Sequence, residues 1–472
     1  MSDSTPSLPP AGRAGVGPNK AGLNRTGLNI AGLNKIPIQI LLFLILVIMV
    51  PIQFSISPGG LLLTPARVYL IVMAFVILPR LGRLQLFDWF FLGHVGWVCM
   101  AYLLIYGPGR VLEPAGSYVL EFAVVYLLAR VYLQNPEQIK ATIGVIFILV
   151  VLSAAFALPE AITGIRVVHE FATAVTGNVY RLDSEIRMGI YRAHSFFEHP
   201  ILYGVFCAAS FSLVWFASTP AQRLYRAPII VFATWLSASS APILMLLVQI
   251  ALLVVERLTR RIRRRDKLLG WSAAAFVLLV ETATGRGVVG LVTLMTLNPA
   301  TAYTRRAQWI FAIDDVMRNP IFGFRPELYT RPFWLAPSID NWWLLIMMRS
   351  GIPSLVLLAL SALFLWAAIV RREGPPLFTQ LRTAWGLMLI AIILGAATVT
   401  FFGKLQPLFA FYMGMGAALA TCYLPGRDAA PEAAAEQDRP RYTRFSAGAT
   451  VRADQGRARG AGPRKRDPGG RR

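Results

Sequence analysis

Long apolar runs alternate with short polar segments along most of this 472-residue chain. The runs are close to 20 residues long, which lets an α-helix cross a hydrocarbon core of about 30 Å. They predict about twelve transmembrane helices, at roughly 36–56, 61–79, 87–107, 116–134, 140–158, 199–217, 224–238, 240–256, 268–284, 343–370, 383–403 and 405–424. The expected fold class is therefore an all-α polytopic membrane protein.

Composition supports this interpretation, and the distribution of charge extends it. Hydrophobic residues make up 56% of the chain and charged residues only 15%, whereas soluble domains have about 25% charged residues. Most of the net charge of +22 lies in polar tails and in every second connection between runs. This is the positive-inside pattern, which predicts a bacterial inner-membrane protein with both termini in the cytoplasm. It explains the basic residues better than nucleic-acid binding does.

The chain divides into one membrane domain and two tails. The polar composition of the two ends predicts disordered cytoplasmic tails at 1–35 and 425–472, the second of them basic. The membrane domain lies between them, at 36–424. Two connections on the outer side are long, at about 159–198 and 285–342, and both are rich in arginine. Long loops cross the membrane regardless of charge, so arginines retained there suggest an anionic ligand.

Each long loop is expected to contain a helix, and the second has a clear helical pattern. Trp309, Ile313, Val316 and Met317 are spaced as one helix face, with Asp314, Asp315 and Arg318 pointing elsewhere. The Asn319-Pro320 pair predicts the end of that helix. The helix would either lie on the membrane surface or cap the helical bundle.

Several well-defined chemistries lack their motifs in this sequence. The chain contains no P-loop and no Rossmann glycine pattern, which disfavours an ATP-driven pump. It also contains no HExxH motif and no cysteine pair at metal-binding spacing, so we expect neither a metal site nor a cofactor. The candidate chemistry is therefore carried by arginines, histidines and carboxylates of the outer loops.

The first candidate cluster ends the first long loop, at Tyr191–Pro200. Arg192 at the membrane mouth is suited to bidentate binding of a phosphate, or to anchoring on a lipid headgroup. His194 and His199 are candidates for acid-base groups, with a structural role as the alternative for each. Pro200 is typical of the first turn of a helix.

The second candidate cluster comes from both ends of the second long loop. Arg305 and Trp309 belong to the predicted helix, and Asp340 and Asn341 open the next apolar run. Asp340 is either a helix cap or a general base that accepts a proton from a sugar hydroxyl. Trp342 is suited to stacking on a sugar, although tryptophan is also common at membrane interfaces.

Together the clusters resemble the O-antigen ligase/polymerase family. RAHSFFEHPILYG at Arg192–Gly204 is similar to its Arg-x-x-Gly-x-Phe-x-(His/Asn)-Pro stretch, RRAQWIFAIDDVMRNPIFG at Arg305–Gly323 to its Arg-x3-Trp-x2-Ala…Pro-x2-Gly stretch, and DNWWLLIMMRSG at Asp340–Gly351 to its His-Asn-x-x-Leu…Gly stretch. Order and spacing agree from about residue 36 to 424. The chain departs from the pattern at Ser195 and Arg325, where glycines are common, and at Asp340, where ligases have histidine.

The resemblance implies a GT-C-like membrane glycosyltransferase that uses a glycan on undecaprenyl diphosphate as its donor. It implies that arginines neutralise the departing diphosphate, with Arg192 and Arg305 as first choices and Arg306 and Arg187 behind them. Asp340 or His199 would orient or deprotonate the acceptor hydroxyl, and Trp309, Asn341, Trp342 and His194 would contact sugar. The implied transfer inverts the anomeric centre without a metal.

Asp340 in place of histidine favours a polymerase that lengthens an exopolysaccharide, capsule or O-antigen over a ligase that transfers finished glycan to another acceptor. A lipid-linked-sugar transporter is the alternative from another class, because about twelve spans fit it too. The expected partners are membrane lipid and, for a polymerase, a regulator of chain length.

Overall fold

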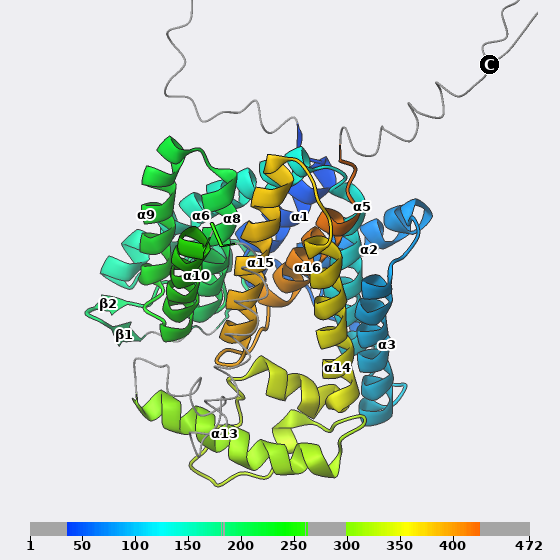
Figure 1. Ribbon diagram of the computed structural model, residues 1–472. Helices are drawn as coiled ribbons and strands as arrows, with labels where there is room; N and C mark the ends of the chain where they lie inside the picture. The colour runs from blue at the N-terminus through cyan, green and yellow to red at the C-terminus, as the bar shows by residue number, and fades with distance from the viewer. Residues whose placement is uncertain (1–34, 181, 183–184, 260, 263–298, 425–472) are drawn as a thin grey trace, which may run out of the picture. The chain divides into compact units, whose positions relative to one another are not determined.

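The computed structural model describes residues 35–180, 182, 185–259, 261–262 and 299–424 (Figure 1). Among these residues, seven helical segments are long and apolar enough to cross a membrane. They are α3 (Leu86–Tyr106), the continuous segment Leu112–Tyr132, α6 (Pro136–Thr163), α8 (Pro200–Ala217), α10 (Ser240–Thr259), α14 (Trp342–Val370) and α15 (Pro376–Ala396). The prediction of an all-α membrane protein is confirmed at this level.

Four further predicted spans coincide with shorter helices. These are α1 (Ile38–Met49), α2 (Pro65–Ile77), α9 (Pro220–Leu236) and α16 (Leu405–Thr421), with 12, 13, 17 and 17 residues. The run at 36–56 is interrupted because α1 ends before Pro51, which starts the short 3₁₀ turn η2 (Ile52–Phe54). The predicted span at 268–284, residues 1–34 of the predicted tail at 1–35 and the predicted tail at 425–472 lie outside the described residues, so the count of twelve stays a prediction.

The helices pack in two groups that meet along α16. In one group, α8 is buried over nearly its whole length against α6, α9, α10 and α15. In the other, α14 packs along α3, and α16 packs on α5 (Val125–Tyr132). The segment Leu112–Tyr132 joins α4 (Leu112–Tyr118), the π-helical turn η5 (Val119–Val124) and α5. Figure 1 shows α1 and α16 between the two groups.

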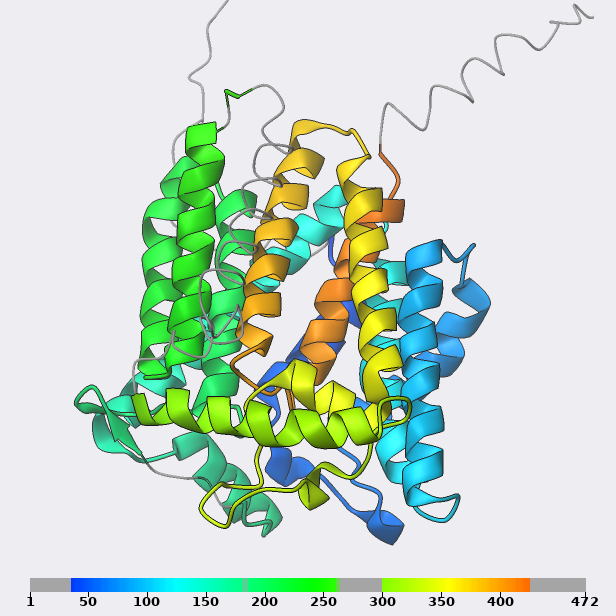
Figure 2. The same ribbon diagram turned by 60° about the horizontal axis from the view of Figure 1, so that its bottom comes forward.

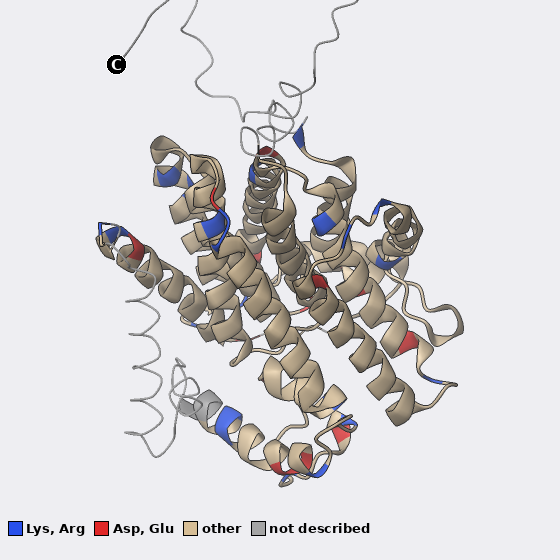
Figure 3. Cartoon of the chain, turned by 45° about the vertical axis from the view of Figure 1, so that its right-hand side comes forward, with Lys and Arg blue, Asp and Glu red and all other residues tan. Residues whose placement is uncertain are grey.

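Charged residues are concentrated at the ends of the helices. Figure 3 shows the long helices mostly in tan, whereas the blue and red of Lys, Arg, Asp and Glu gather in the connections and on α13 (Pro299–Arg318). Arg130, a charge inside a helical segment long enough to span, is paired with Asp88, with an Nε–Oδ1 distance of 2.7 Å. This partition follows from the high cost of leaving an ion unpaired in hydrocarbon.

Two small elements accompany α13 at one end of the bundle. Figure 2 shows α13 lying across the ends of the long helices, and the hairpin of β1 (Ile186–Arg187) and β2 (Ile190–Tyr191) lies at the same end. The short helix α7 (Val167–Thr176) belongs to the same long connection as the hairpin. The prediction of a helix in each long loop is therefore confirmed.

The predicted face of α13 is only partly correct. The helix ends at Arg318, as the Asn319-Pro320 pair predicts, and Val316 is fully buried. Met317, however, is 63% exposed, and Asp315 lies on the buried side. The Asp315 carboxylate accepts hydrogen bonds from the backbone N–H of Thr330 at 2.6 Å and from Arg318 at 2.9 Å, which explains how a charge is tolerated there.

Two glycines allow the loop after α13 to make close backbone contact with α14. Gly323 and Gly351 both have positive φ, at 75° and 78°. A Cβ on Gly323 would lie 2.3 Å from the Met348 carbonyl oxygen, and one on Gly351 would lie 2.0 Å from that of Ile321. The backbones are therefore close enough for Phe324 N–H to donate to Met348 O at 2.6 Å. Both positions need glycine, because any side chain meets backbone there.

Candidate functional site

A cavity of about 780 Å³ brings the two sequence clusters together. Its walls come from the hairpin and the segment after it, the starts of α8 and α10, α13, the loop between α13 and α14, the first turns of α14 and the connection after α15. Its charged and titratable lining residues are Glu185, Arg187, Arg192, His199, Arg305, Glu327, Asp340 and Arg349. Five predicted site residues, Arg187, Arg192, His199, Arg305 and Asp340, thus share one cavity.

One side of the cavity contains two arginines held by a single carboxylate. Glu185 accepts from Arg187 Nε and from Arg192 Nη1, each at 2.6 Å. Burial alone would raise the pKa of Glu185, but the hydrogen bonds and charges of the two arginines lower it overall. Arg192 is only 7% exposed and also donates to Ser239 Oγ at 2.9 Å. Arg192 is therefore fixed in place before any ligand arrives.

Arg305 and Asp340 face the cavity from opposite ends of the second long loop. Arg305 is 7% exposed, and its Nε and Nη1 atoms are buried without a hydrogen-bond partner among the described residues. Such donors are costly to leave unpaired, so the geometry is suited to an anionic ligand. Burial raises the pKa of Asp340, and the nearby charge of Arg305 partly opposes that rise.

The position of Asp340 is set by its neighbours and not by a capping role. Gln308 accepts from the Asp340 backbone N–H at 3.0 Å and donates to Ser338 O at 2.8 Å, which ties the segment to α13. The first turn of α14 is capped by Asn341, whose side chain accepts from Leu344 N–H at 3.0 Å. The alternative in which Asp340 caps the helix is therefore wrong, and its carboxylate is available to the cavity.

His199 has a capping role that restricts its chemistry. Its Nδ1 accepts from the backbone N–H of Ile201 at 3.2 Å, so that His199 and Pro200 start α8 as the sequence predicts. In a neutral ring with Nδ1 as acceptor, the proton is on Nε2. In this tautomer His199 carries its proton at Nε2 and cannot accept another one there. Asp340 is consequently the better candidate for the base.

Five other predicted site residues do not line the cavity. Arg306 is exposed on α13, and Trp309 packs into the small core between α13 and α14. Asn341 is engaged in capping, as described. Trp342 is 2% exposed and stacks on Phe401, with ring centroids 4.7 Å apart. The predicted sugar contact of Trp342 is corrected, because its ring is buried in the core, whereas that of Trp309, which is partly buried, stays a prediction.

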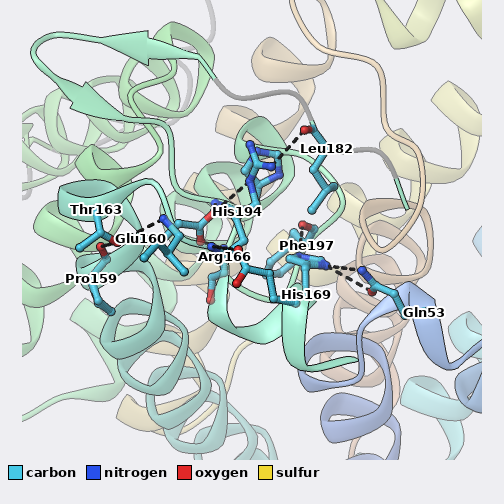
Figure 4. A network of polar contacts seen from close by, with 12 residues as sticks. Gln53, Pro159, Glu160, Thr163, Arg166, His169, Leu182, His194 and Phe197 are labelled. Carbon is cyan, nitrogen blue, oxygen red and sulfur yellow. Dashed lines mark hydrogen bonds and ion pairs between the residues drawn. The ribbon is translucent and has the colours of Figure 1, made fainter. Parts of the chain in front are cut away.

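His194 is the fifth of these residues, and it lies in a buried polar network that shapes the loop before α8. Glu160 accepts from the backbone N–H groups of His194 and Ser195 at 3.0 and 2.8 Å, and Arg166 lies 3.6 Å from the same carboxylate. His169 joins this network through the Phe197 carbonyl oxygen at 3.1 Å. Figure 4 shows these groups gathered around Glu160. The structure therefore assigns His194 a structural setting in place of the predicted sugar contact.

Ser195 adopts a conformation that glycine would favour. Its φ is 54°, in the left-handed region, and glycine is common at this position in the family that the sequence resembles. The side chain compensates in part, because Ser195 Oγ donates to the Ser153 carbonyl oxygen at 2.8 Å. Ser195 is therefore held in a left-handed conformation by its own side-chain hydrogen bond.

Sequence reasoning missed several polar residues of the cavity, above all Arg349 and Glu185. Arg349 is a charge inside a predicted apolar span, which is a signal for function in itself. Glu185 carried no comparable signal, since a lone acid in a long polar loop is usually solvated.

Comparisons with models of protein families and with curated proteins found no match for this chain. Among the described residues, no group of three or more His, Cys, Asp or Glu side chains lies close enough to hold a metal ion.

Proposed function

We propose that this chain is a membrane polysaccharide polymerase that joins undecaprenyl-diphosphate-linked repeat units at the extracytoplasmic face of the bacterial inner membrane. The observation that carries the proposal is one cavity lined by four arginines and the Asp340 carboxylate, built at the end of a bundle of apolar helices. The proposal includes a GT-C-like arrangement of about twelve spans, with both termini in the cytoplasm. The sequence resemblance to the O-antigen ligase/polymerase family supports it.

The proposed reaction is a direct displacement. An oxygen of the acceptor sugar forms a bond to the anomeric carbon of the donor as the bond from that carbon to the diphosphate breaks. The diphosphate leaves with the bonding electron pair, and the hydroxyl proton passes to the Asp340 carboxylate. The attack from the opposite face inverts the anomeric centre.

The arginines supply the electrostatic part of this reaction. Negative charge develops on the leaving diphosphate, and donors that are already oriented stabilise it without reorganising during the step. Arg192 is pre-oriented by Glu185 and Ser239, and Arg305 presents buried N–H groups that still need an acceptor. The same chemistry in many transferases uses a divalent metal ion, and the arginines take that role in this proposal.

A ligase that transfers finished glycan to another acceptor uses the same donor chemistry. The choice between the two rests on Asp340, because ligases of the resembled family have histidine at the matching position. A deletion strain separates them. Loss of a polymerase leaves single lipid-linked repeats, whereas loss of a ligase leaves long lipid-linked polymer.

The test is complementation of that deletion strain with full-length variants. We expect Arg305→Gln and Asp340→Asn to leave single lipid-linked repeats on the outer face and no long polymer, at normal protein level. Arg110→Gln is the control, since Arg110 is exposed in the connection between α3 and α4 and does not line the cavity. Normal polymer length in both cavity variants, or repeats trapped on the cytoplasmic side of the deletion strain, would refute the proposal and favour a transporter.

A further inference from the structure

Arg349 lines the cavity from α14, close to the start of that helix. It lies seven residues after Trp342 and two residues before Gly351, where the backbone of α14 is kinked. Leu345, one turn earlier on the same face, lines the cavity as well. Arg349 therefore reaches the cavity from the first segment of α14, whereas Arg187 and Arg192 reach it from the first long loop.

The neighbours of Arg349 leave its positive charge uncompensated by a close carboxylate. It hydrogen-bonds the phenol of Tyr102 on α3, and its charge acts on the phenols of Tyr106 and Tyr118. Glu327 and Asp340 line the same cavity. Within the part of the chain that the structure describes, neither of them forms an ion pair with Arg349.

Other arginines among the helices are treated differently. Arg130 is paired with Asp88 at 2.7 Å, and Arg67 with Glu121 at 2.8 Å. Those pairs satisfy the demand that a charge in a membrane span be neutralised. Arg349 instead has neutral phenols on one side and a cavity on the other. This contrast points to a positive charge that a bound anion would neutralise.

We infer that Arg349 binds the second phosphate of the lipid diphosphate, with Arg305 on the first, and so selects a diphosphate over a monophosphate carrier. The inference rests on the proposed function and adds a residue that sets substrate specificity. A diphosphate offers two groups of acceptor oxygens, and two planar guanidinium forks are suited to hold both. A monophosphate offers its acceptor oxygens to Arg305 alone. Arg349 then keeps the same neighbours as in the protein without a ligand.

The test measures binding of two defined probes, undecaprenyl diphosphate and undecaprenyl monophosphate, to the purified full-length protein in nanodiscs. We expect the wild type to prefer the diphosphate. Loss of one charge-assisted interaction corresponds to roughly a tenfold or larger loss of affinity. Arg349→Gln should therefore weaken diphosphate binding by about that factor and leave monophosphate binding within about twofold, whereas Arg305→Gln should weaken both.

Arg325→Gln is the matched control. Arg325 belongs to the same neighbourhood, with its guanidinium 5.1 Å from the Tyr106 ring centre, but it does not line the cavity. We expect it to keep the wild-type preference. Arg349→Lys retains charge and lacks the fork, so its preference should be intermediate. This variant also tests the inference if the glutamine variant fails to fold.

The outcomes separate the two proposals. If the wild type prefers the diphosphate and Arg349→Gln keeps that preference, the inference about Arg349 is wrong and the proposed function stands. An equal loss for both probes in folded Arg349→Gln would also overturn it, because it indicates a general role in shaping the cavity. If the wild type binds neither probe, the proposed function itself is contradicted.

Discussion

The four arginines that line the cavity differ in the groups that they contact. Arg187 and Arg192 share the Glu185 carboxylate, so a bound anion must compete with that carboxylate or displace it. Arg305 has buried N–H groups with no acceptor among the described residues, and Arg349 has phenols for neighbours. The residues with the least internal compensation are those from which a ligand gains most, since it satisfies donors that are otherwise unpaired.

Asp340 is the residue whose protonation controls the proposed reaction, and this gives a prediction about pH. Burial raises its pKa above the ordinary value of 3.8, and a base works only in its deprotonated form. We expect kcat/KM for transfer to fall as the pH drops through the raised pKa, with a midpoint above 3.8. Asp340→Asn should lower the rate by about 100-fold or more and remove this acid limb from the remaining activity.

The measurement is a pH profile of polymer formation with purified protein and synthetic lipid-linked repeats. Asp314→Asn is a suitable control, because Asp314 is exposed on the same long loop and lies outside the cavity. An acid limb that persists in Asp340→Asn would assign the base to another group. His199 would be the next residue to test, although its Nδ1 already accepts from Ile201 N–H.

At the scale of elements, local sequence signals predicted helix ends better than helix faces. Pro200 and the Asn319-Pro320 pair mark a start and an end that the structure confirms. The sequence did not predict the burial of Asp315, because this burial depends on a hydrogen bond from Thr330. Thr330 lies fifteen residues later, in a loop whose path the sequence does not specify. Capping by Asn341 and not Asp340 likewise depends on backbone angles that sequence does not specify.

Charged site residues were easier to predict than aromatic ones. Arg192, Arg305 and Asp340 stood out because a charge beside an apolar run needs a reason. A tryptophan near the end of a span looks the same in sequence whether it faces lipid, sugar or core. Trp342 therefore gave no indication that it stacks on Phe401, 59 residues later in sequence, inside the bundle.

The glycine contact between the α13–α14 loop and α14 gives a prediction about stability. In Gly351→Ala the new Cβ meets the Ile321 carbonyl at a positive φ, and in Gly323→Ala it meets the Met348 carbonyl. We expect each variant to lose about 2 kcal/mol or more of unfolding free energy, because strained φ and backbone overlap add. Unfolding in mixed detergent micelles measures this.

Gly144→Ala is the control for that experiment. Gly144 is a helical glycine in α6, and a methyl group added there would have no neighbouring atom within 4 Å outside its own helix backbone. Alanine at this position should therefore be neutral or stabilise by up to about 1 kcal/mol. Equal stability of Gly351→Ala and Gly144→Ala would show that the loop does not need the close backbone contact.

At the scale of the molecule, the helices separate a charged end containing the cavity from a largely apolar interior. The hairpin, α13 and the starts of α8 and α14 all belong to this end. The arrangement suits a reaction between a lipid whose chain stays among apolar helices and a glycan that stays in water. Which face of the membrane this end occupies follows from the positive-inside pattern of the sequence and is part of the proposal.

That orientation gives the last prediction. Met188 is 50% exposed at the tip of the hairpin before α8, and Ala221 is exposed in the first turn of α9, close after α8 and before the predicted span at 224–238. Because α8 is long enough to cross the membrane, the two positions belong to opposite faces. In a variant whose three natural cysteines are replaced, we expect Met188→Cys to react with a membrane-impermeant maleimide in intact cells. Ala221→Cys should react only after the membrane is opened. The reverse pattern would place the arginine cavity on the cytoplasmic side and contradict the extracytoplasmic reaction of the proposed function.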